Sequence, residues 1–351
     1  MIRVGVLFGG ANSEHDVSCA SAAAVAEALD RSRFEVVLIG IDRTGSWHRV
    51  DSVGQLDVAA GGSRHPNLAD LDVAFPVLHG RFGEDGTVQG LLELADVPYV
   101  GCGVLASALA MDKRMASRVL SAAGVPTVQT LSVTRDSRYE AIGKAALLGF
   151  PLFVKPNRAG SSVGAGRVDV ASQLMPAVDE ALAEDWRALL QPVIDGEEVD
   201  VGILQLPDGR LIAGAPLRVH PAAGNPFFDF AAKYTAGGAE FEVPAALAPA
   251  TAARVIELAE RAFRALGCVG LARVDFFLRA DGEIVLNEIN TMPGLTARSQ
   301  YPRMFGAIGM SFPVLLSAVV DTAVAGYETV TGDAARFGGS ARVAAVRGGS
   351  S

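Results

Sequence analysis

Hydrophobic residues in the first third of the chain follow two alternating periods. Apolar, strand-like runs occupy residues 2–8, 34–41 and 71–78, whereas residues 17–29 and the segment "GTVQGLLELADV" have helical spacing. Strands that alternate with helices predict βαβ units and therefore a parallel, doubly wound sheet. We expect this first domain to cover residues 1–101.

The pattern changes after residue 101. A helix is predicted near residues 107–123, and "FPLFVKPNRAGSSVGAGRV" predicts a strand, a Gly/Ser-rich loop and another strand. From residue 188, "ALLQPVI", "EVDVGILQL" and "RLIAGAPLRV" predict closely spaced strands, followed by a polar loop at 220–240 and a helix at 249–266. We expect a central domain at 102–187 and a C-terminal domain at 188–330. After a last helix in "SFPVLLSAVVDTAVAGY", residues 331–351 lack periodicity and are expected to be disordered.

A candidate hairpin lies in "LARVDFFLRADGEIVLNEIN", where two β-rich apolar runs flank the turn signal "DG". Counting outward from a two-residue turn places Asp275 opposite Glu288. The same register places Arg273 opposite Asn290, on the same face of the sheet.

Two carboxylates directly opposite each other destabilise a sheet unless something offsets their repulsion. A hard divalent cation held by oxygen ligands would do so, which predicts a Mg²⁺ site at Asp275, Glu288 and Asn290. The alternative is a solvated face of an edge hairpin on which Arg273 neutralises one carboxylate.

Three glycine-containing segments are further candidates for contacts with a nucleotide or a substrate. "KPNRAGSSVGAG" follows Lys155 with small residues whose N–H groups can approach phosphate, either as a flap over a nucleotide or as a simple turn. "LFGGANSEHDVS" places Glu14 after a strand, either contacting substrate or, with Ser13, capping a helix. "HGRFGEDGTVQG" follows a strand end where open α/β sheets bind ligands. There, His79 is either a substrate contact or a loop histidine, and Glu84-Asp85 could cap the next helix.

Composition narrows the class of protein. The 351 residues are enough for two or three domains. Half are hydrophobic, yet no run of about 18 apolar residues occurs, so no membrane span is expected. "MIRVGVLFGG" begins with a strand-like run and no signal peptide, which predicts a cytoplasmic protein. The net charge of −9 disfavours a nucleic-acid partner, and the scattered cysteines disfavour a zinc site or disulfide framework.

Taken in order, six segments resemble the D-alanine:D-alanine ligase family of ATP-grasp enzymes, over about residues 2–325. They are "FGGANSEHDVS", "HGRFGEDGTVQG", "MDKRMASRVLSAAGVPT", "VKPNRAGSSVG", "FFDFAAKY" and "ARVDFFL…EIVLNEINTMPGLTARS". The resemblance implies an α/β, ATP-grasp fold with an N-terminal doubly wound (Rossmann-like) domain, a central flap domain and a C-terminal α+β domain. The implied reaction joins two D-alanines through a D-alanyl phosphate, with ATP as co-substrate, for peptidoglycan precursor synthesis.

The resemblance also implies roles for particular residues. Asp275, Glu288 and Asn290 would hold two Mg²⁺ (or Mn²⁺). The ATP-binding residues would be Lys113, Lys155, Ser162, Gln191, Val193, Ile194, Glu198 and Lys233. Two positions depart from the family pattern, because Gln191 stands where glutamate is usual and Ala159 where an acidic residue is common.

Substrate roles are implied in the same way. Glu14 would bind the ammonium of the first D-alanine, and Ser161 and Tyr234 would bond to Glu14 and close the site. Arg273 and the Gly294 N–H would stabilise the tetrahedral oxyanion. The remaining substrate contacts would be Ser299 at the carboxylate of the second D-alanine and His79 near the first.

The sequence also bears on the identity of the second substrate. "AKY" and the lack of histidine between Pro221 and Tyr234 favour an amine nucleophile over D-lactate, although Phe228 and Phe230 stand where tyrosine is more usual. A ligase of this fold that uses D-lactate, D-serine or another second substrate is the main alternative. An ATP-grasp ligase of unrelated substrates and a non-enzymatic nucleotide-binding protein are the others. Family analogy predicts a homodimer.

Overall fold

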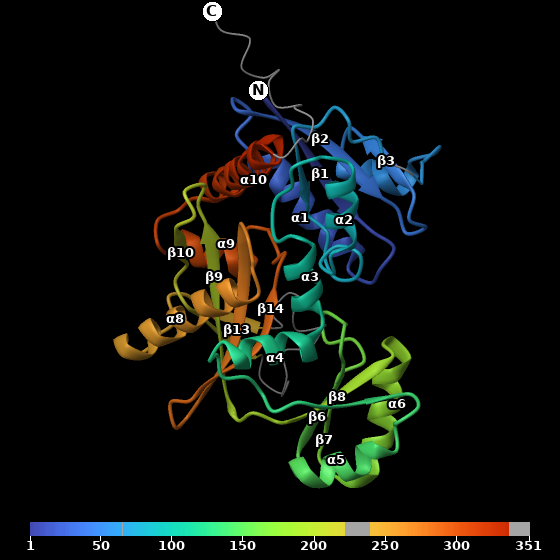
Figure 1. The fold of residues 1–351 in the computed structure, drawn as a ribbon, viewed down its shortest axis with the longest axis vertical. Helices are drawn as coiled ribbons and strands as arrows, with labels where there is room; N and C mark the ends of the chain where they lie inside the picture. The colour runs from blue at the N-terminus through green and yellow to red at the C-terminus, as the bar shows by residue number, and fades with distance from the viewer. Residues whose placement is uncertain (65, 222–238, 337–351) are drawn as a thin grey trace, which may run out of the picture.

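The computed structural model describes residues 1–64, 66–221 and 239–336, and these form three β-sheets (Figure 1). The N-terminal sheet and the last helix lie at one end of the molecule, and the green central strands lie at the other. The third sheet lies between them.

The N-terminal sheet has the strand order β3-β2-β1-β4. β1 (Ile2–Gly9) is parallel to β2 (Phe34–Ile41) and β4 (Val73–Pro76), while the short edge strand β3 (Trp47–Val50), which was not predicted, is antiparallel to β2. The helical elements are α1 (His15–Ala28), η1 (Val53–Val58) and α2 (Thr87–Leu94).

Alternate residues of β1 face opposite layers of helix. Val4, Val6 and Phe8 belong to the core that contains α1 and the last helix, α10 (Phe312–Arg336). Leu7 belongs to the core that contains α2. Helices therefore cover both faces of the sheet, which confirms the doubly wound prediction.

The central sheet is antiparallel, in the order β5-β8-β6-β7, and has its own core. Its elements are β5 (Leu131–Thr134), α5 (Glu140–Leu148), β6 (Leu152–Pro156), β7 (Gly166–Val168), η2 (Ala171–Gln173), α6 (Leu174–Glu184) and β8 (Arg187–Pro192). The predicted strand, loop and strand are confirmed as β6 and β7. The two helices were not predicted. α5 buries only small residues, Ala141 and Ala145, whereas α6 buries Leu174, Val178, Ala181 and Leu182.

The third sheet has the order β12-β11-β9-β13-β14, with β10 beside β9. Its strands are β9 (Gly196–Gln205), β10 (Leu211–Ala213), β11 (Leu217–Pro221), β12 (Ala239–Glu242), β13 (Leu271–Arg279) and β14 (Ile284–Asn290). One core joins it to α3 (Val104–Met111), α4 (Lys113–Ala122) and α8 (Pro249–Ala265). A second core joins it to α9 (Gln300–Gly306) and to the N-terminal sheet.

Two predicted elements are divided in the structure. The helix expected at 107–123 is two helices, α3 and α4, and Asp112 between them accepts a hydrogen bond from Met115 N at 3.0 Å. "RLIAGAPLRV" forms β10 and β11 with Gly214 between them, where an added Cβ would come within 2.7 Å of Met304 Cβ. Close packing against α9 therefore requires glycine there.

The β13–β14 hairpin has the predicted pairing at the candidate site, but the predicted turn is wrong. Arg279 N donates to Glu283 O at 2.9 Å, which makes a three-residue loop. A register shift next to Asp275 then leaves Asn287 as an extra residue in β14. This bulge restores the pairing of Asp275 with Glu288 and of Arg273 with Asn290, so the two deviations from the regular hairpin cancel.

The C-terminal helix α10 continues to Arg336, so the first residues assigned to the disordered tail are helical. The rest of that tail lies outside the described residues. Among the helices that are described, none combines the length and apolar character needed to cross a bilayer.

Candidate active site

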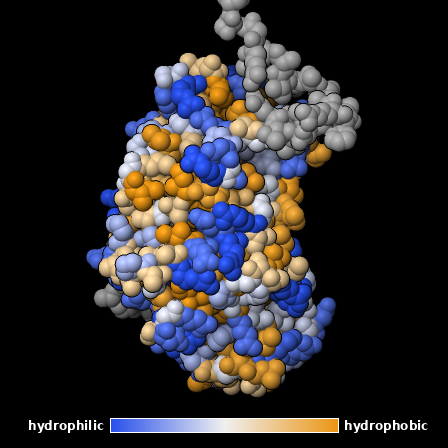
Figure 2. Space-filling model, turned by 60° about the vertical axis from the view of Figure 1, so that its left-hand side comes forward, coloured by the Kyte–Doolittle hydropathy of each residue, from blue (hydrophilic) through white to orange (hydrophobic). Residues whose placement is uncertain are grey.

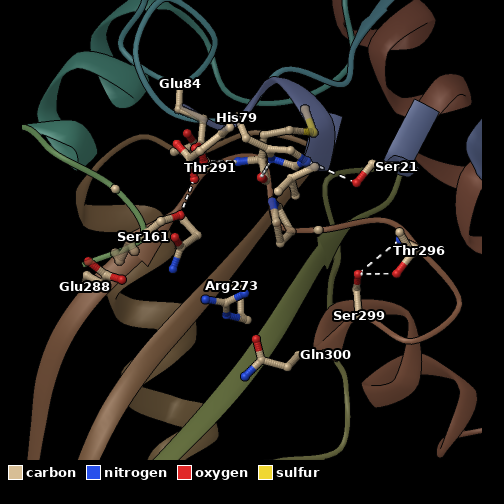
Figure 3. A pocket seen from close by; sticks show the side chains of 18 of the residues that line it. Ser21, His79, Glu84, Ser161, Arg273, Glu288, Thr291, Thr296, Ser299 and Gln300 are labelled. Carbon is tan, nitrogen blue, oxygen red and sulfur yellow. Dashed lines mark hydrogen bonds between the residues drawn. The ribbon is translucent and has the colours of Figure 1, made fainter. Parts of the chain in front are cut away.

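A cavity of about 810 Å³ lies where the N-terminal sheet, the β6–β7 loop and the β13–β14 hairpin meet (Figure 3). Its lining includes residues predicted for metal, nucleotide and substrate. They are Glu14, His79, Lys113, Ser161, Arg273, Glu288, Asn290, Gly294 and Ser299. The fold thus brings together side chains that are far apart in the sequence.

Glu14 connects two parts of the cavity wall. It is buried at the N-cap of α1 without making a side-chain cap, so the alternative of simple capping with Ser13 is wrong. Instead, Ser161 Oγ donates to Glu14 Oε1 at 2.5 Å. A Cβ at Gly80 would lie 1.9 Å from Glu14 Oε2, and one at Gly160 would lie 3.0 Å from it. Glycine at both positions lets the two loops enclose this carboxylate.

The β6–β7 loop has an unusual backbone. Ser161 and Ser162 have φ of 50° and 60°, which non-glycine residues adopt at a cost in free energy and mostly at functional sites. Lys113 Nζ donates to Ala159 O at 2.8 Å and lies 3.4 Å from Glu288 Oε2. Because the backbone of Ala159 makes this contact, the loss of an acidic side chain there leaves it intact.

The predicted metal ligands form an oxygen-rich group on one sheet face. Arg273 donates from Nε and Nη2 to the two oxygens of Asp275, each at 2.7 Å, and Asn290 Nδ2 donates to Asp275 Oδ2 at 2.8 Å. Burial lowers the pKa of Arg273, but Asp275, Asp200 and Glu288 outweigh burial and raise it. The surplus of carboxylates and the all-oxygen donor set fit Mg²⁺ or Mn²⁺.

His79 has a protein partner on each ring nitrogen. Burial lowers its pKa, which favours the neutral ring. Nδ1 then donates to Met292 O at 3.0 Å, and Nε2 accepts from Ser21 Oγ at 3.1 Å. These contacts favour a role in holding the loop after β14 over direct contact with substrate.

Glu84 was predicted only as a possible helix cap, yet it supports the same loop. Its oxygens accept hydrogen bonds from Gly80 N at 2.7 Å and from Met292 N at 3.1 Å. Burial, followed by the charge of Glu14, raises the pKa of Glu84 to about 8. Gly86, not Glu84 or Asp85, is the N-cap of α2, although Asp85 Oδ1 accepts from Thr87 N, the first residue of the helix, at 3.0 Å.

The loop from Met292 to Ser299 forms the opposite wall of the cavity. A Cβ at Gly294 would lie 2.9 Å from Ser299 Oγ, so the backbone can approach this closely only with glycine. Ser299 Oγ also accepts from Thr296 N at 3.1 Å, which fixes the predicted substrate contact in place (Figure 3).

Sequence profiles of one family match both halves of the chain. Residues 3–102 match the D-ala D-ala ligase N-terminus, and residues 119–321 match the D-ala D-ala ligase C-terminus. The chain belongs to the D-alanine–D-alanine ligase family. The structure accordingly has the ATP-grasp fold, as predicted.

Relatives in this family are similar along nearly their whole length. A D-alanine–D-alanine ligase of Mycolicibacterium smegmatis is 44% identical, covering 92% of this chain and 95% of its own. One of Nocardia farcinica is also 44% identical, covering 92% and 97%. Among solved structures, the VanG D-Ala:D-Ser ligase of Enterococcus faecalis is 35% identical, with a TM-score of 0.82 over 92% of this chain and 99% of its own. The D-alanine-D-alanine ligase of Coxiella burnetii is 29% identical, with a TM-score of 0.83 over 96% and 97%.

Two of the nucleotide residues predicted from the ligase family, Lys113 and Gln191, line a second, smaller cavity, together with Asn287 and others. Gln191 Nε2 donates to Thr130 Oγ1 at 2.8 Å, and Lys155 Nζ donates to Asn287 Oδ1 at 3.4 Å. Val193 N donates to Pro151 O at 3.1 Å, and Ile194 follows just beyond β8.

Glu198 lies apart from that cavity, with the carboxylates of the third sheet. One of its carboxylate oxygens lies within 4.8 Å of one oxygen of Asp200 and one of Asp275. Asp200 was not predicted as a site residue, although an acidic residue inside the apolar run "EVDVGILQL" is a signal, since buried charges need partners. Lys233 and Tyr234 lie outside the described residues.

Proposed function

We propose that this protein joins two D-alanines into D-alanyl-D-alanine, converts ATP to ADP and phosphate, and supplies the dipeptide for peptidoglycan precursors in the cytoplasm. The observation that carries this proposal is that Glu14, Arg273 and Glu288 line the same cavity. The chain's membership of the ligase family supports the same conclusion.

ATP would lie across both cavities. Gln191, through its carbonyl oxygen, and the backbone of Val193 and Ile194 would receive the adenine, and Glu198 the ribose. The phosphates would meet Lys113, Lys155, the Ser162 N–H and Lys233. Asp275, Glu288 and Asn290 would hold two Mg²⁺ (or Mn²⁺), which supply positive charge to the transferring phosphoryl group.

The first substrate would be held by its ammonium on Glu14, so that its carboxylate oxygen attacks the γ-phosphorus and ADP leaves. The amine of the second D-alanine, held at its carboxylate by Ser299, then attacks the acyl carbon. Arg273 and the Gly294 N–H would stabilise the resulting oxyanion before phosphate departs. His79 would act by holding the Met292 backbone beside these groups.

The hydrogen bond from Ser161 to Glu14, together with Tyr234, would keep the β6–β7 loop closed over the acyl phosphate and exclude water. We retain the predicted boundary at residue 101 and the homodimer as part of this proposal. Because β8 (Arg187–Pro192) pairs within the central sheet and α10 runs to Arg336, we propose residues 192 and 336 in place of the predicted boundaries at 187 and 330.

The deciding experiment measures ADP release with Mg²⁺ and D-alanine, alone and with equimolar D-serine or D-lactate, and identifies the products by mass. D-alanyl-D-alanine as the main product supports the proposal. A dominant D-alanyl-D-serine product would favour the second candidate, which the likeness to the D-Ala:D-Ser ligase supports. The absence of ADP with every acceptor would refute both. As a control on the metal assignment, a folded Glu288→Gln variant should show no turnover.

A further inference from the structure

Asp200 is a fully buried carboxylate to which the proposed reaction assigns no role. It lies on β9 directly opposite Asp275 of β13, with 0% of its surface exposed. Gln300 Nε2 donates to Asp200 Oδ2 at 2.7 Å, and Arg273 Nε lies 3.8 Å from the same oxygen. Arg273 and Gln300 line the cavity (Figure 3), and Asp200 is not among its lining residues.

The contacts of Arg273 conflict with the proposed metal site. Its guanidinium engages both oxygens of Asp275, and Asn290 adds a third hydrogen bond. A divalent cation that coordinates Asp275 would compete with Arg273 for those oxygens. A buried guanidinium that loses its closest carboxylate is strongly destabilised, so Arg273 then needs another anion within reach.

Asp200 fits that requirement. Its Oδ2 is close enough that a small movement of the Arg273 side chain would complete an ion pair. The same oxygen accepts the hydrogen bond from Gln300, the residue after Ser299. An Arg273 guanidinium paired with Asp200 would therefore remain beside the loop that carries Gly294 and Ser299.

We propose that Asp200 is a positioning residue, which receives the Arg273 guanidinium when a divalent cation occupies Asp275 and keeps it directed at the acceptor side of the cavity. This inference rests on the proposed function. A rival role exists, because the carboxylates of Glu198, Asp200 and Asp275 lie close enough to share a cation directly.

The test is calorimetric binding of ADP with and without Mn²⁺ to the wild-type chain and to Asp200→Asn. Without Asp200, Arg273 stays on Asp275 and opposes the metal. We therefore expect Mn²⁺-dependent ADP affinity to fall about 10-fold to 100-fold, the range for residues that support metal ligands, and ADP binding without Mn²⁺ to be unchanged. Asp200→Glu, which keeps the charge, should restore part of the affinity and tests the idea if Asp200→Asn does not fold.

A double-mutant cycle with Arg273→Met separates the proposal from the rival. If Asp200 acts through Arg273, Asp200→Asn has no further effect on Mn²⁺-dependent ADP binding once Arg273 is replaced. If Asp200→Asn lowers the Mn²⁺-dependent affinity for ADP equally with Arg273 and with Met at position 273, Asp200 binds the metal directly and the proposal is overturned. The proposal is also overturned if Asp200→Asn binds ADP with Mn²⁺ as the wild type does.

Asp42→Asn is the matched control. Asp42 is also a multiply hydrogen-bonded carboxylate, with partners Thr44, Ser46 and His48, but it does not line the cavity. The Asp42→Asn variant should bind ADP in the presence of Mn²⁺ with the affinity of the wild type. Because binding does not depend on turnover, failure of this inference is distinguishable from failure of the ligase assignment, which product analysis decides.

Discussion

At the scale of single residues, the cavity depends on carboxylates placed where water is scarce. Glu14, Glu84 and Asp275 each accept hydrogen bonds from groups in other segments of the chain. Each carboxyl group is therefore stabilised by particular donors, and the substitutions that matter are those that remove a donor or an acceptor.

Glu84 predicts a specific dependence of stability on pH. Its pKa is raised from the ordinary 4.5 to about 8, so between these values the folded protein holds a proton that the unfolded chain has released. The stabilisation of the folded state by this proton is complete below pH 4.5 and is lost as the pH rises through 8. In the ligand-free protein, the free energy of unfolding should therefore fall between pH 6 and pH 9, by at most about 1.4 kcal/mol per unit.

The Glu84→Gln variant tests this prediction. Its free energy of unfolding and that of the wild type are measured with urea at several pH values. Glutamine offers one acceptor for two backbone donors, so the variant should be about 1–3 kcal/mol less stable at pH 6. Its stability should decline less steeply towards pH 9 than that of the wild type. Parallel pH profiles for the two proteins would mean that Glu84 titrates in its ordinary range.

At the scale of elements, the start of α4 is tied to the end of β6. Asn157 is fully buried, its carbonyl oxygen accepts from Lys113 N at 3.3 Å, and its Oδ1 accepts from Arg114 N at 3.0 Å. The first N–H groups of a helix have no partner inside it, so a residue distant in sequence acts here as the cap. This cap also places Lys113 in the cavity.

Asn157→Ala should therefore lower both stability and nucleotide affinity. Loss of the Oδ1 acceptor leaves Arg114 N without that partner and should cost about 1–2 kcal/mol in thermal unfolding. The KM for ATP should rise as Lys113 loses its fixed position. Asn67→Ala is the control, because it removes an exposed Oδ1 acceptor, that of Ala69 N, away from α4 and the cavity, and it should remain close to wild type.

At the scale of the whole molecule, the three sheets meet around the cavity, and hydrophilic and hydrophobic residues are interspersed on the face seen in Figure 2. The bond from Ser161 to Glu14 spans the cavity between the central sheet and the N-terminal sheet. It therefore couples closure of the β6–β7 loop to the group proposed to hold the first substrate.

Ser161→Ala should uncouple phosphate release from ligation. With the loop less firmly closed, water can reach the D-alanyl phosphate, so the ratio of phosphate to dipeptide should rise severalfold above one. The measurement compares phosphate with dipeptide in a single reaction. Ser13→Ala is the control, since Ser13 is exposed and does not cap α1, and it should keep the ratio near one. A wild-type ratio for Ser161→Ala would contradict the proposed closure.

The sequence by itself determined the alternation of strands and helices in the first sheet, the order of the family motifs, and the shared face of Asp275 and Glu288. These features depend on residues that are close in the chain, through the periods of strand and helix and the chemistry of turns. Even the wrong turn left the pairing at Asp275 correct, because the Asn287 bulge offset it by one residue.

Only the tertiary structure decided which partner each polar group has. Met292 meets Glu84 across 208 positions, Gln300 meets Asp200 across 100, and Asn157 meets the start of α4, at Arg114, across 43. Such contacts leave no local period in the sequence. They exist because the packing of three sheets brings the segments together and removes the water that would otherwise satisfy these groups.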